Sequence, residues 1–251
     1  MRRLILAGLV AVLAVPSALS AASVANPAAV VGKENYGFTM EVENQKKEID
    51  GDLTESRRYL GKAIWGATDK FDLYVRLGVS DQKVYADGAP DFRGHEGMTY
   101  GAGLRFLIAE TENPNLQAFF DFQGLGYSSD GTVYVPRTSG DDAWVEKYYN
   151  VYDMREYQFS FFAVWKREIW QPYIGFSLIN ISGDVKRDLY LIADDSEVFE
   201  DSSRDEFGEN AIPEFVAGGD ISLGDAGRLS GELRFGQGEI SFFVGLSELW
   251  H

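Results

Sequence analysis

The chain has 251 residues, which allows one large all-β domain or two small ones. Its formal net charge of -16 argues against nucleic acid as a partner, because binding to phosphates needs clustered Lys and Arg. The sequence contains no Cys, which excludes disulfides, thiol nucleophiles and zinc sites of the Cys type.

The first residues have the pattern of an export signal. Arg2 and Arg3 form a basic start, and residues 4–15 are an apolar run of the length typical of a signal-peptide core. Small residues follow, and cleavage after Ala22 or after Ala25 fits the small-residue rule. The alternative, a single membrane anchor, needs a longer run of about 20 residues. With no Cys after the run, a lipid-anchored lipoprotein is excluded. We expect three parts: a signal peptide at 1–25, a lead-in at 26–34 and a barrel domain at 35–251.

The clearest strand pattern lies at residues 71–79. Five apolar side chains alternate there with Asp72, Tyr74, Arg76 and Gly78. Because successive side chains of a strand point to opposite faces, one face of this strand is apolar and the other is polar. The preceding turn, 68–70, is too short for a crossover helix, which predicts an antiparallel hairpin with the strand before it.

The same period recurs along the chain and predicts about ten strands, with eight as the alternative count. In chain order we expect them at 35–43, 57–67, 71–79, 98–109, 116–127, 154–166, 170–182, 213–223, 229–235 and 239–247. Long connections are expected at 44–56, 80–97, 128–153 and 183–212, and they alternate with short turns. An up-and-down meander would place all the long loops at one end, as in outer-membrane barrels with short periplasmic turns and long external loops. The predicted fold class is therefore an all-β, antiparallel, up-and-down transmembrane β-barrel.

Alternation alone does not say which face points inward. A soluble periplasmic barrel of the lipocalin kind, with the apolar face inside, is the alternative to the membrane barrel. Aromatic residues near strand ends favour the membrane, because interfacial girdles are aromatic; they are Tyr36, Phe71, Tyr100, Trp165, Phe215 and Phe235. The polar face carries charges that suit a lumen filled by ion pairs: Glu41, Asp72, Arg76, Arg105, Asp121, Asp220, Glu232 and Arg234.

Three stretches, 65–74, 100–106 and 171–176, resemble hairpins of small Gram-negative outer-membrane β-barrel proteins, the broad OmpA/OmpW-like group. The resemblance implies an outer-membrane location and assembly by the barrel-assembly machinery, which recognises a final strand ending in an aromatic residue. Trp250 fits that signal, whereas Glu248 and His251 depart from it. No catalytic motif of the group maps onto this sequence.

Two features are candidates for chemistry. His95 lies beside Glu96 and near Asp87 and Asp91, which would suit a hydrolase or a metal site, but no HExxH or GxSxG motif supports either. The connection 183–212 is rich in carboxylates, and residues 194–197 offer oxygen ligands for calcium, without the order of an EF-hand loop. We expect a solvated histidine and a hydrated acidic loop instead, and we assign no catalytic, cofactor-binding or metal residues. The apolar insert 189–192 predicts that a barrel strand continues above the membrane.

The sequence therefore predicts a non-enzymatic outer-membrane barrel that acts as a surface or envelope scaffold. Expected partners are outer-membrane lipids, the barrel-assembly machinery and divalent cations at external loops. The alternatives are a narrow channel for a small or apolar solute, a soluble periplasmic binding barrel, and a barrel hydrolase that uses His95. A wide aqueous pore is disfavoured, because such channels need about 16 strands.

Overall fold

A computed structural model describes residues 31–85, 90–111, 115–139, 142–193 and 196–250. The predicted signal peptide and the first part of the lead-in lie outside these residues. The described residues form twelve strands: β1 (Tyr36–Ile49), β2 (Asp52–Thr68), β3 (Phe71–Ser80), β4 (Lys83–Tyr85), β5 (Phe92–Arg93), β6 (Gly97–Glu110), β7 (Leu116–Ser139), β8 (Asp142–Trp165), β9 (Trp170–Ala193), β10 (Ser196–Leu223), β11 (Gly227–Gly236) and β12 (Glu239–Trp250). Among the described residues, no helix has the length and apolar character needed to cross a membrane.

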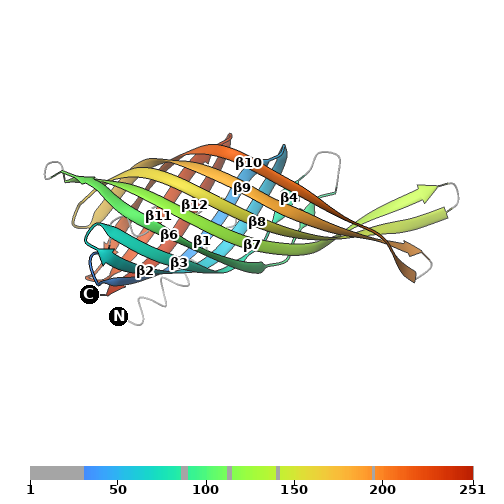
Figure 1. The fold of residues 1–251 in the computed structure, drawn as a ribbon, viewed down its shortest axis with the longest axis horizontal. Coiled ribbons are helices and arrows are strands. Elements are labelled where there is room, and N and C mark those ends of the chain that lie inside the picture. The colour runs from blue at the N-terminus through green and yellow to red at the C-terminus, as the bar shows by residue number, and fades with distance from the viewer. Residues whose placement is uncertain (1–30, 86–89, 112–114, 140–141, 194–195, 251) are drawn as a thin grey trace.

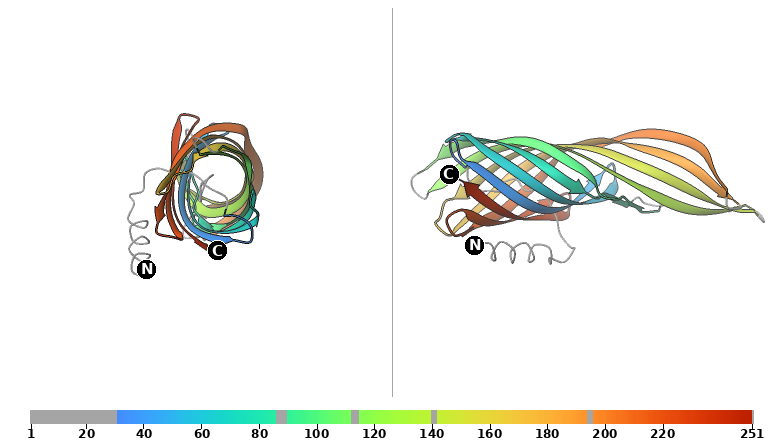
Figure 2. Two further views of the ribbon diagram at one scale, coloured as in Figure 1. Left: turned by 90° about the vertical axis from the view of Figure 1, so that its left-hand side faces the viewer. Right: turned by 90° about the horizontal axis from the view of Figure 1, so that it is seen from below.

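Ten of the strands close into a ring of antiparallel neighbours (Figure 2). Their order is β1-β12-β11-β10-β9-β8-β7-β6-β3-β2, and β1 pairs with β2 to complete the circle. Each strand pairs with the next in sequence, apart from β4 and β5, which form a small sheet on β2. The ring confirms the predicted meander and its ten strands. Within the described residues, every strand of the ring has a paired neighbour on both sides, which is what a sheet needs to sit in lipid.

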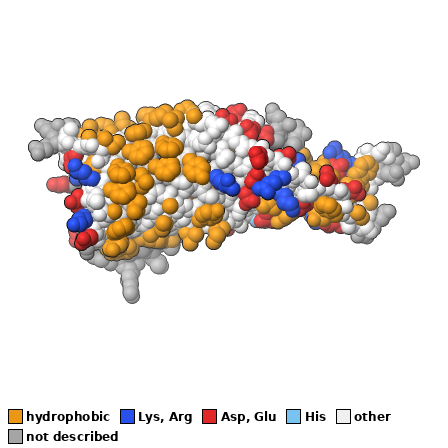
Figure 3. Space-filling model, in the orientation of Figure 1, with side chains coloured by type: hydrophobic (Ala, Val, Ile, Leu, Met, Phe, Trp, Pro, Cys, Tyr) orange, Lys and Arg blue, Asp and Glu red, His pale blue; other side chains and the backbone are white. Residues whose placement is uncertain are grey.

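The two faces of the wall are chemically opposite. Outward side chains are largely apolar and exposed, for example Val75, Leu77, Tyr100 and Phe161, and they cover the barrel in Figure 3. Inward side chains include many buried charged groups. This is the arrangement expected of a membrane barrel, and it is the reverse of the soluble barrel with an apolar interior.

The two longest connections were predicted wrongly. The described parts of these connections, 128–139, 142–153, 183–193 and 196–212, are not loops but continuations of β7, β8, β9 and β10, which reach 24 to 28 residues in length. Pairing persists as far as Ser139↔Asp142 in one hairpin and Ala193↔Ser196 in the other. The acidic and small residues there resemble a loop in composition, yet cross-strand pairing with a long neighbour satisfies their backbone. The expected connection 44–56 is likewise strand, apart from the turn between Ile49 and Asp52.

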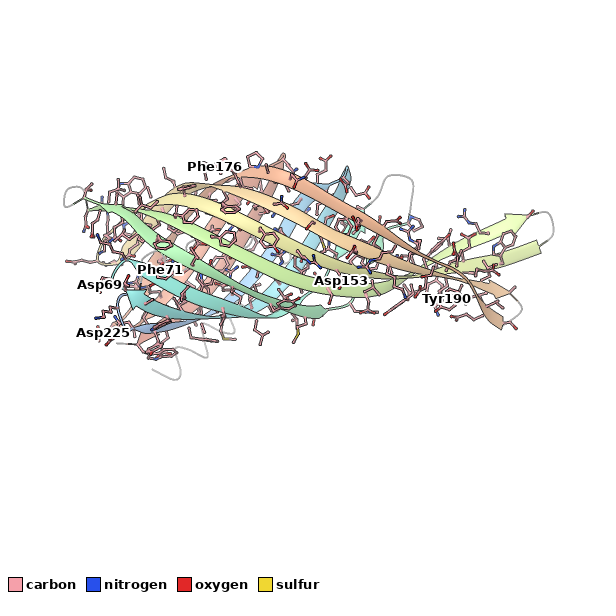
Figure 4. The ribbon with its side chains drawn as sticks, viewed as in Figure 1. Asp69, Phe71, Asp153, Phe176, Tyr190 and Asp225 are labelled. Carbon is pink, nitrogen blue, oxygen red and sulfur yellow. The ribbon has the colours of Figure 1, made fainter. Side chains whose placement is uncertain are left out.

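These four strand extensions form a sheet that we call the projection, residues 128–139, 142–153, 183–193 and 196–212. It stands beyond the ring because β6 pairs with β7 only as far as Tyr127, and β11 pairs with β10 only from Phe215. Figure 1 shows it leaving one end of the barrel. The short turns containing Asp69 and Asp225 lie at the opposite end, and Tyr190 lies far out on the projection (Figure 4). We call the end with the projection the outer end and the other the inner end.

Candidate functional site

The barrel lumen holds a dense set of buried charges. Successive side chains of a strand point to opposite faces, so every second side chain points into the lumen. Each strand therefore contributes a row of inward groups. The buried cations are Lys47, Arg58, Lys62, Arg76, Arg105 and Arg234, and the buried carboxylates are Glu41, Glu43, Asp72, Asp121, Glu156, Glu214, Asp220 and Glu232. All four of these arginines are among the largest fully buried side chains of the described residues. A charge removed from water requires a partner, and the lumen supplies partners across strands.

One half of the network joins β1, β2, β3 and β8. Arg76 places a guanidinium nitrogen 2.9 Å from Glu41 and 3.4 Å from Glu43. Arg58 lies 3.9 Å from Glu43 and 3.0 Å from Glu156 on the other side of the lumen. A single chain of contacts therefore crosses the barrel through alternating cations and carboxylates.

The other half joins β1, β8, β10 and β11. The Lys47 ammonium lies between Glu156 and Glu214, at 3.8 and 3.7 Å. Arg234 pairs with Glu214 at 3.1 Å and with Glu232 at 2.8 Å. Because Glu156 contacts both Lys47 and Arg58, the two halves form one continuous network.

Tyrosines and an arginine complete the polar contacts near the inner end. Arg105 pairs with Asp121 at 3.1 Å, and the Tyr74 hydroxyl donates a hydrogen bond of 2.8 Å to the same carboxylate. The Tyr173 hydroxyl donates one of 2.8 Å to Glu232. These hydrogen bonds fix the rings of Tyr74 and Tyr173 inside the lumen, so the polar network also positions large aromatic side chains.

Apolar clusters lie on both sides of the charged layer. Toward the outer end, one cluster contains Ile49, Tyr127, Met154, Ile179, Ile181 and Ile212. Toward the inner end lie a cluster of Phe119, Phe162, Val164, Tyr173 and Val216 and another of Val31, Ile64 and Tyr74. The lumen is thus occupied by side chains along its length.

The described end of the lead-in contributes to the inner closure. The Val31 backbone N–H donates to the Asp72 carboxylate at 3.1 and 3.3 Å, and the Val31 side chain is buried against Ile64 and Tyr74. Glu34 N–H donates to the Gly66 carbonyl at 2.8 Å. This segment therefore lies against β2 at the inner mouth.

The predicted lumen arginines are confirmed as buried, and carboxylates predicted on the same face are among their partners. Arg105 meets Asp121 and Arg234 meets Glu232, pairs that the sequence left unassigned. Asp220 instead has Arg228 at 3.9 Å. Sequence reasoning did not single out Lys47, Arg58, Lys62, Glu156 or Glu214. A signal for Lys47 existed, because the alternation of the first strand continues through Glu43, Gln45 and Lys47 into the stretch that was taken for a connection.

His95 is not at the centre of a constellation. Its ring is 76% exposed, and Nδ1 lies 3.6 Å from Asp130, a carboxylate of β7 that also accepts a hydrogen bond from the Tyr149 hydroxyl. Asp87 lies outside the described residues. In the described part of the chain, no group of three or more His, Cys, Asp or Glu residues is placed to hold a metal ion.

The stretch considered for calcium binding, 194–197, is described only in part. Asp194 and Asp195 lie outside the described residues, and Glu197 pairs with Lys147 at 2.8 Å. Cation binding there stays a prediction. The prediction for residues 189–192 is confirmed, because they belong to β9 above the ring.

The predicted aromatic girdle residues lie on the outward face. Tyr36, Tyr100, Phe215 and Phe235 are exposed, and Phe71 stacks on Phe106 with ring centroids 4.3 Å apart. Trp250, the aromatic residue of the final strand, is also exposed. Rings at these positions suit the boundary between lipid and water.

No protein-family model matches the chain, and no curated protein matches it. Several solved structures are similar in fold. The translocator domain of autotransporter NalP from Neisseria meningitidis is 8% identical, with a TM-score of 0.40, covering 88% of this chain and 89% of that one. The outer membrane protease OmpT from Escherichia coli is 10% identical, with a TM-score of 0.37, covering 86% and 93%. The COG4313 outer membrane channel from Pseudomonas putida F1 is 11% identical, with a TM-score of 0.33, covering 94% and 98%. At these TM-scores the fold is described from the strand pairing of the chain itself. The resemblance to the OmpA/OmpW-like group stays a prediction.

Proposed function

We propose that the protein is an outer-membrane barrel with a filled, non-conducting lumen, and that its role is to hold the projection outside the membrane as a surface or envelope scaffold. The observation that carries the proposal is the continuous ion-pair network from Arg76 through Glu156 to Arg234. The charges of this network are ion-paired across the lumen and flanked by apolar clusters, an arrangement that suits a filled barrel rather than an open path for a solute. Small barrels are filled in this way.

The location rests on the outward face. A closed sheet whose outward side chains are apolar is stable in lipid, where unpaired backbone groups would be costly. Outer-membrane lipids are therefore the proposed surroundings of the apolar outward face, which we call the belt. The exposed Trp250 on the final strand is the proposed signal for the barrel-assembly machinery. In this orientation the outer end, with its longer elements, faces away from the cell.

We also propose that the scaffold is non-enzymatic. Among the described residues, the exposed ring of His95 has one carboxylate within ion-pair distance, Asp130, and the Ser129 hydroxyl donates to the His95 carbonyl rather than to its ring. A His95→Ala variant should therefore retain any hydrolysis detected in a preparation of the protein. Loss of that hydrolysis would revive the enzyme hypothesis.

Conductance across a planar lipid bilayer is the decisive test. The wild-type barrel should be silent, and an Arg76→Ser/Arg234→Ser double variant should conduct, because two large side chains of the network are removed. Steady conductance of the wild type would favour the narrow channel. Protease added to intact cells should cut the projection and spare the barrel, whereas protection of both would contradict a surface role.

A further inference from the structure

Beyond the ring, the two outer strands of the projection, β7 and β10, have no further strand paired with them among the described residues, so each has an open edge. Along β7, the strand loses its neighbour β6 beyond Tyr127, and the chain before β6 covers it only a little further, where the His95 N–H donates to the Asp130 carbonyl at 2.6 Å. Within the described part of the chain, residues 132–139 of β7 pair with β8 alone. An open strand edge presents a row of backbone donors and acceptors.

The direction of these backbone groups follows from Asp130. Its carbonyl points to the open side, and peptide groups alternate sides along an antiparallel strand. Thr132, Tyr134 and Pro136 therefore direct their backbone groups outward from the edge. Pro136 agrees with this, because proline has no N–H and is tolerated where that position faces away from the ladder. The edge thus offers two consecutive donor and acceptor pairs, at Thr132 and Tyr134.

Both faces of the sheet next to this edge carry apolar side chains among charged ones. On one face, Val133 and Val135 lie opposite Tyr148 and Glu146 of β8, and these rows continue to Leu189 and Leu191. On the other face, Tyr134 lies opposite Lys147, and the row continues to Tyr190 and Phe199. Tyr134 is 57% exposed and Phe199 is 55% exposed. Figure 3 shows hydrophobic side chains gathered near the far end of the molecule. A strand added here would have the apolar side chains of Val133, Val135 and Tyr134 as its nearest neighbours on β7.

The charge of the projection as a whole favours a cationic occupant. Its described residues carry twelve carboxylates and five Lys or Arg side chains. The cations that β7 and β8 carry there, Arg137 and Lys147, are paired with Glu146 and Glu197. A second copy of the chain would bring the same negative charge, and an anionic lipid surface would also be repelled. A polypeptide with basic residues is attracted, and an extended backbone matches the free donors and acceptors.

We propose that the edge of β7 from Thr132 to Pro136 binds an extended, cationic segment of a partner polypeptide, which adds to the projection as a further strand. Strand addition of this kind takes its affinity from main-chain hydrogen bonds and its selectivity from the flanking side chains. The proposal rests on the proposed function, because it names the class of partner that the projection would meet outside the membrane.

The test uses the full chain in lipid nanodiscs and a labelled nonapeptide of alternating Thr and Val flanked by pairs of Lys. Fluorescence anisotropy should show saturable binding that weakens with salt. Thr132→Pro, which removes an outward N–H, should weaken binding up to about tenfold, since the hydrogen bond that this N–H donates to the docked strand is lost. Thr132→Val keeps the N–H and should bind as the wild type does. Boiled and unboiled gel mobility shows whether each variant is folded.

A second measurement does not depend on folding of the variant. The same peptide with N-methyl groups on alternate residues cannot donate to the edge in one register, and it should bind at least about tenfold more weakly. Equal binding of the methylated and plain peptides, or of a peptide flanked by Glu, would overturn the proposal. If the chain associates with itself and this association competes with the peptide, the occupant of the edge is a second copy of the chain and the proposal is wrong. Absence of peptide binding by a folded chain whose projection is open to protease would overturn the docking site and leave the scaffold function standing.

Discussion

Arg76 on β3 reaches past β2 to Glu41 on β1, with 2.9 Å between the guanidinium and the carboxylate and both side chains buried. The two strands are not hydrogen-bonded to each other, so this ion pair links parts of the wall that the backbone ladder does not join directly. Glu43 shares the same guanidinium at 3.4 Å. Inward charges therefore brace the ring from within.

Removing this guanidinium should be costly. Arg76→Met leaves Glu41 and Glu43 buried without their closest cation, and breaking a buried pair from one side costs about 3–5 kcal/mol in the free energy of unfolding. Urea unfolding of the barrel in detergent micelles measures the change. Arg57→Met, on the outward side of β2, is the matched control and should stay within about 0.5 kcal/mol. Equal losses for the two variants would contradict a bracing role.

A charged side chain on the apolar outward face should lower the free energy of unfolding only where that face contacts lipid. Val75 in the belt is 58% exposed and Val198 on the projection is 54% exposed. Val75→Arg should lower the free energy of unfolding in vesicles by about 2–4 kcal/mol, the penalty for a cation near the middle of the bilayer. Val198→Arg faces water and should change it by less than about 0.5 kcal/mol. Similar tolerance at both positions would mean that the belt does not face lipid.

The inner closure should depend on a glycine of β2. A Cβ at Gly66 would collide with the Gly32 carbonyl, so Gly66→Ala should push the segment that carries Val31 away from the mouth. Since the chain has no Cys, Val31→Cys is a clean reporter. Maleimide labelling of that residue should be slow in the parent and faster with Gly66→Ala. Gly231→Ala, where a Cβ meets nothing within 4 Å, should leave the rate unchanged. Unchanged labelling in the Gly66 variant would show that the segment does not depend on this contact.

The projection should loosen in acid. Hydrogen bonds from Tyr148 and Arg137, 2.7 and 2.9 Å long, hold the pKa of Glu146 below its ordinary value of 4.5. A carboxyl with a depressed folded pKa stabilises the structure above its ordinary pKa, and the effect is lost as pH falls below it. Fluorescence of the neighbouring Trp144 should therefore change as pH drops below about 4.5. Glu146→Gln should remove that part of the titration, and an unaltered curve would contradict the assignment.

Much of the wall was predictable from alternation. Residues 71–79 show the two faces in the sequence itself, and Arg105 and Asp121, which pair in the lumen, were both predicted on the polar face of neighbouring strands. The extent of β9 and β10 was not predictable. Residues 183–212 have the composition of a hydrated loop, and their strand form depends on pairing with each other and with β8. Propensity in strands is dominated by such context.

Local pattern determined the ten strands of the ring, their two faces, the short turns and the antiparallel order, because each depends on residues close together in the chain. Tertiary structure decided which face points inward, that the sheet closes between β1 and β12, and which charges meet. Arg58 and Glu156 are 98 positions apart in sequence and 3.0 Å apart in the lumen. Closure of the ring brings them together, and no pattern within one strand carries that information.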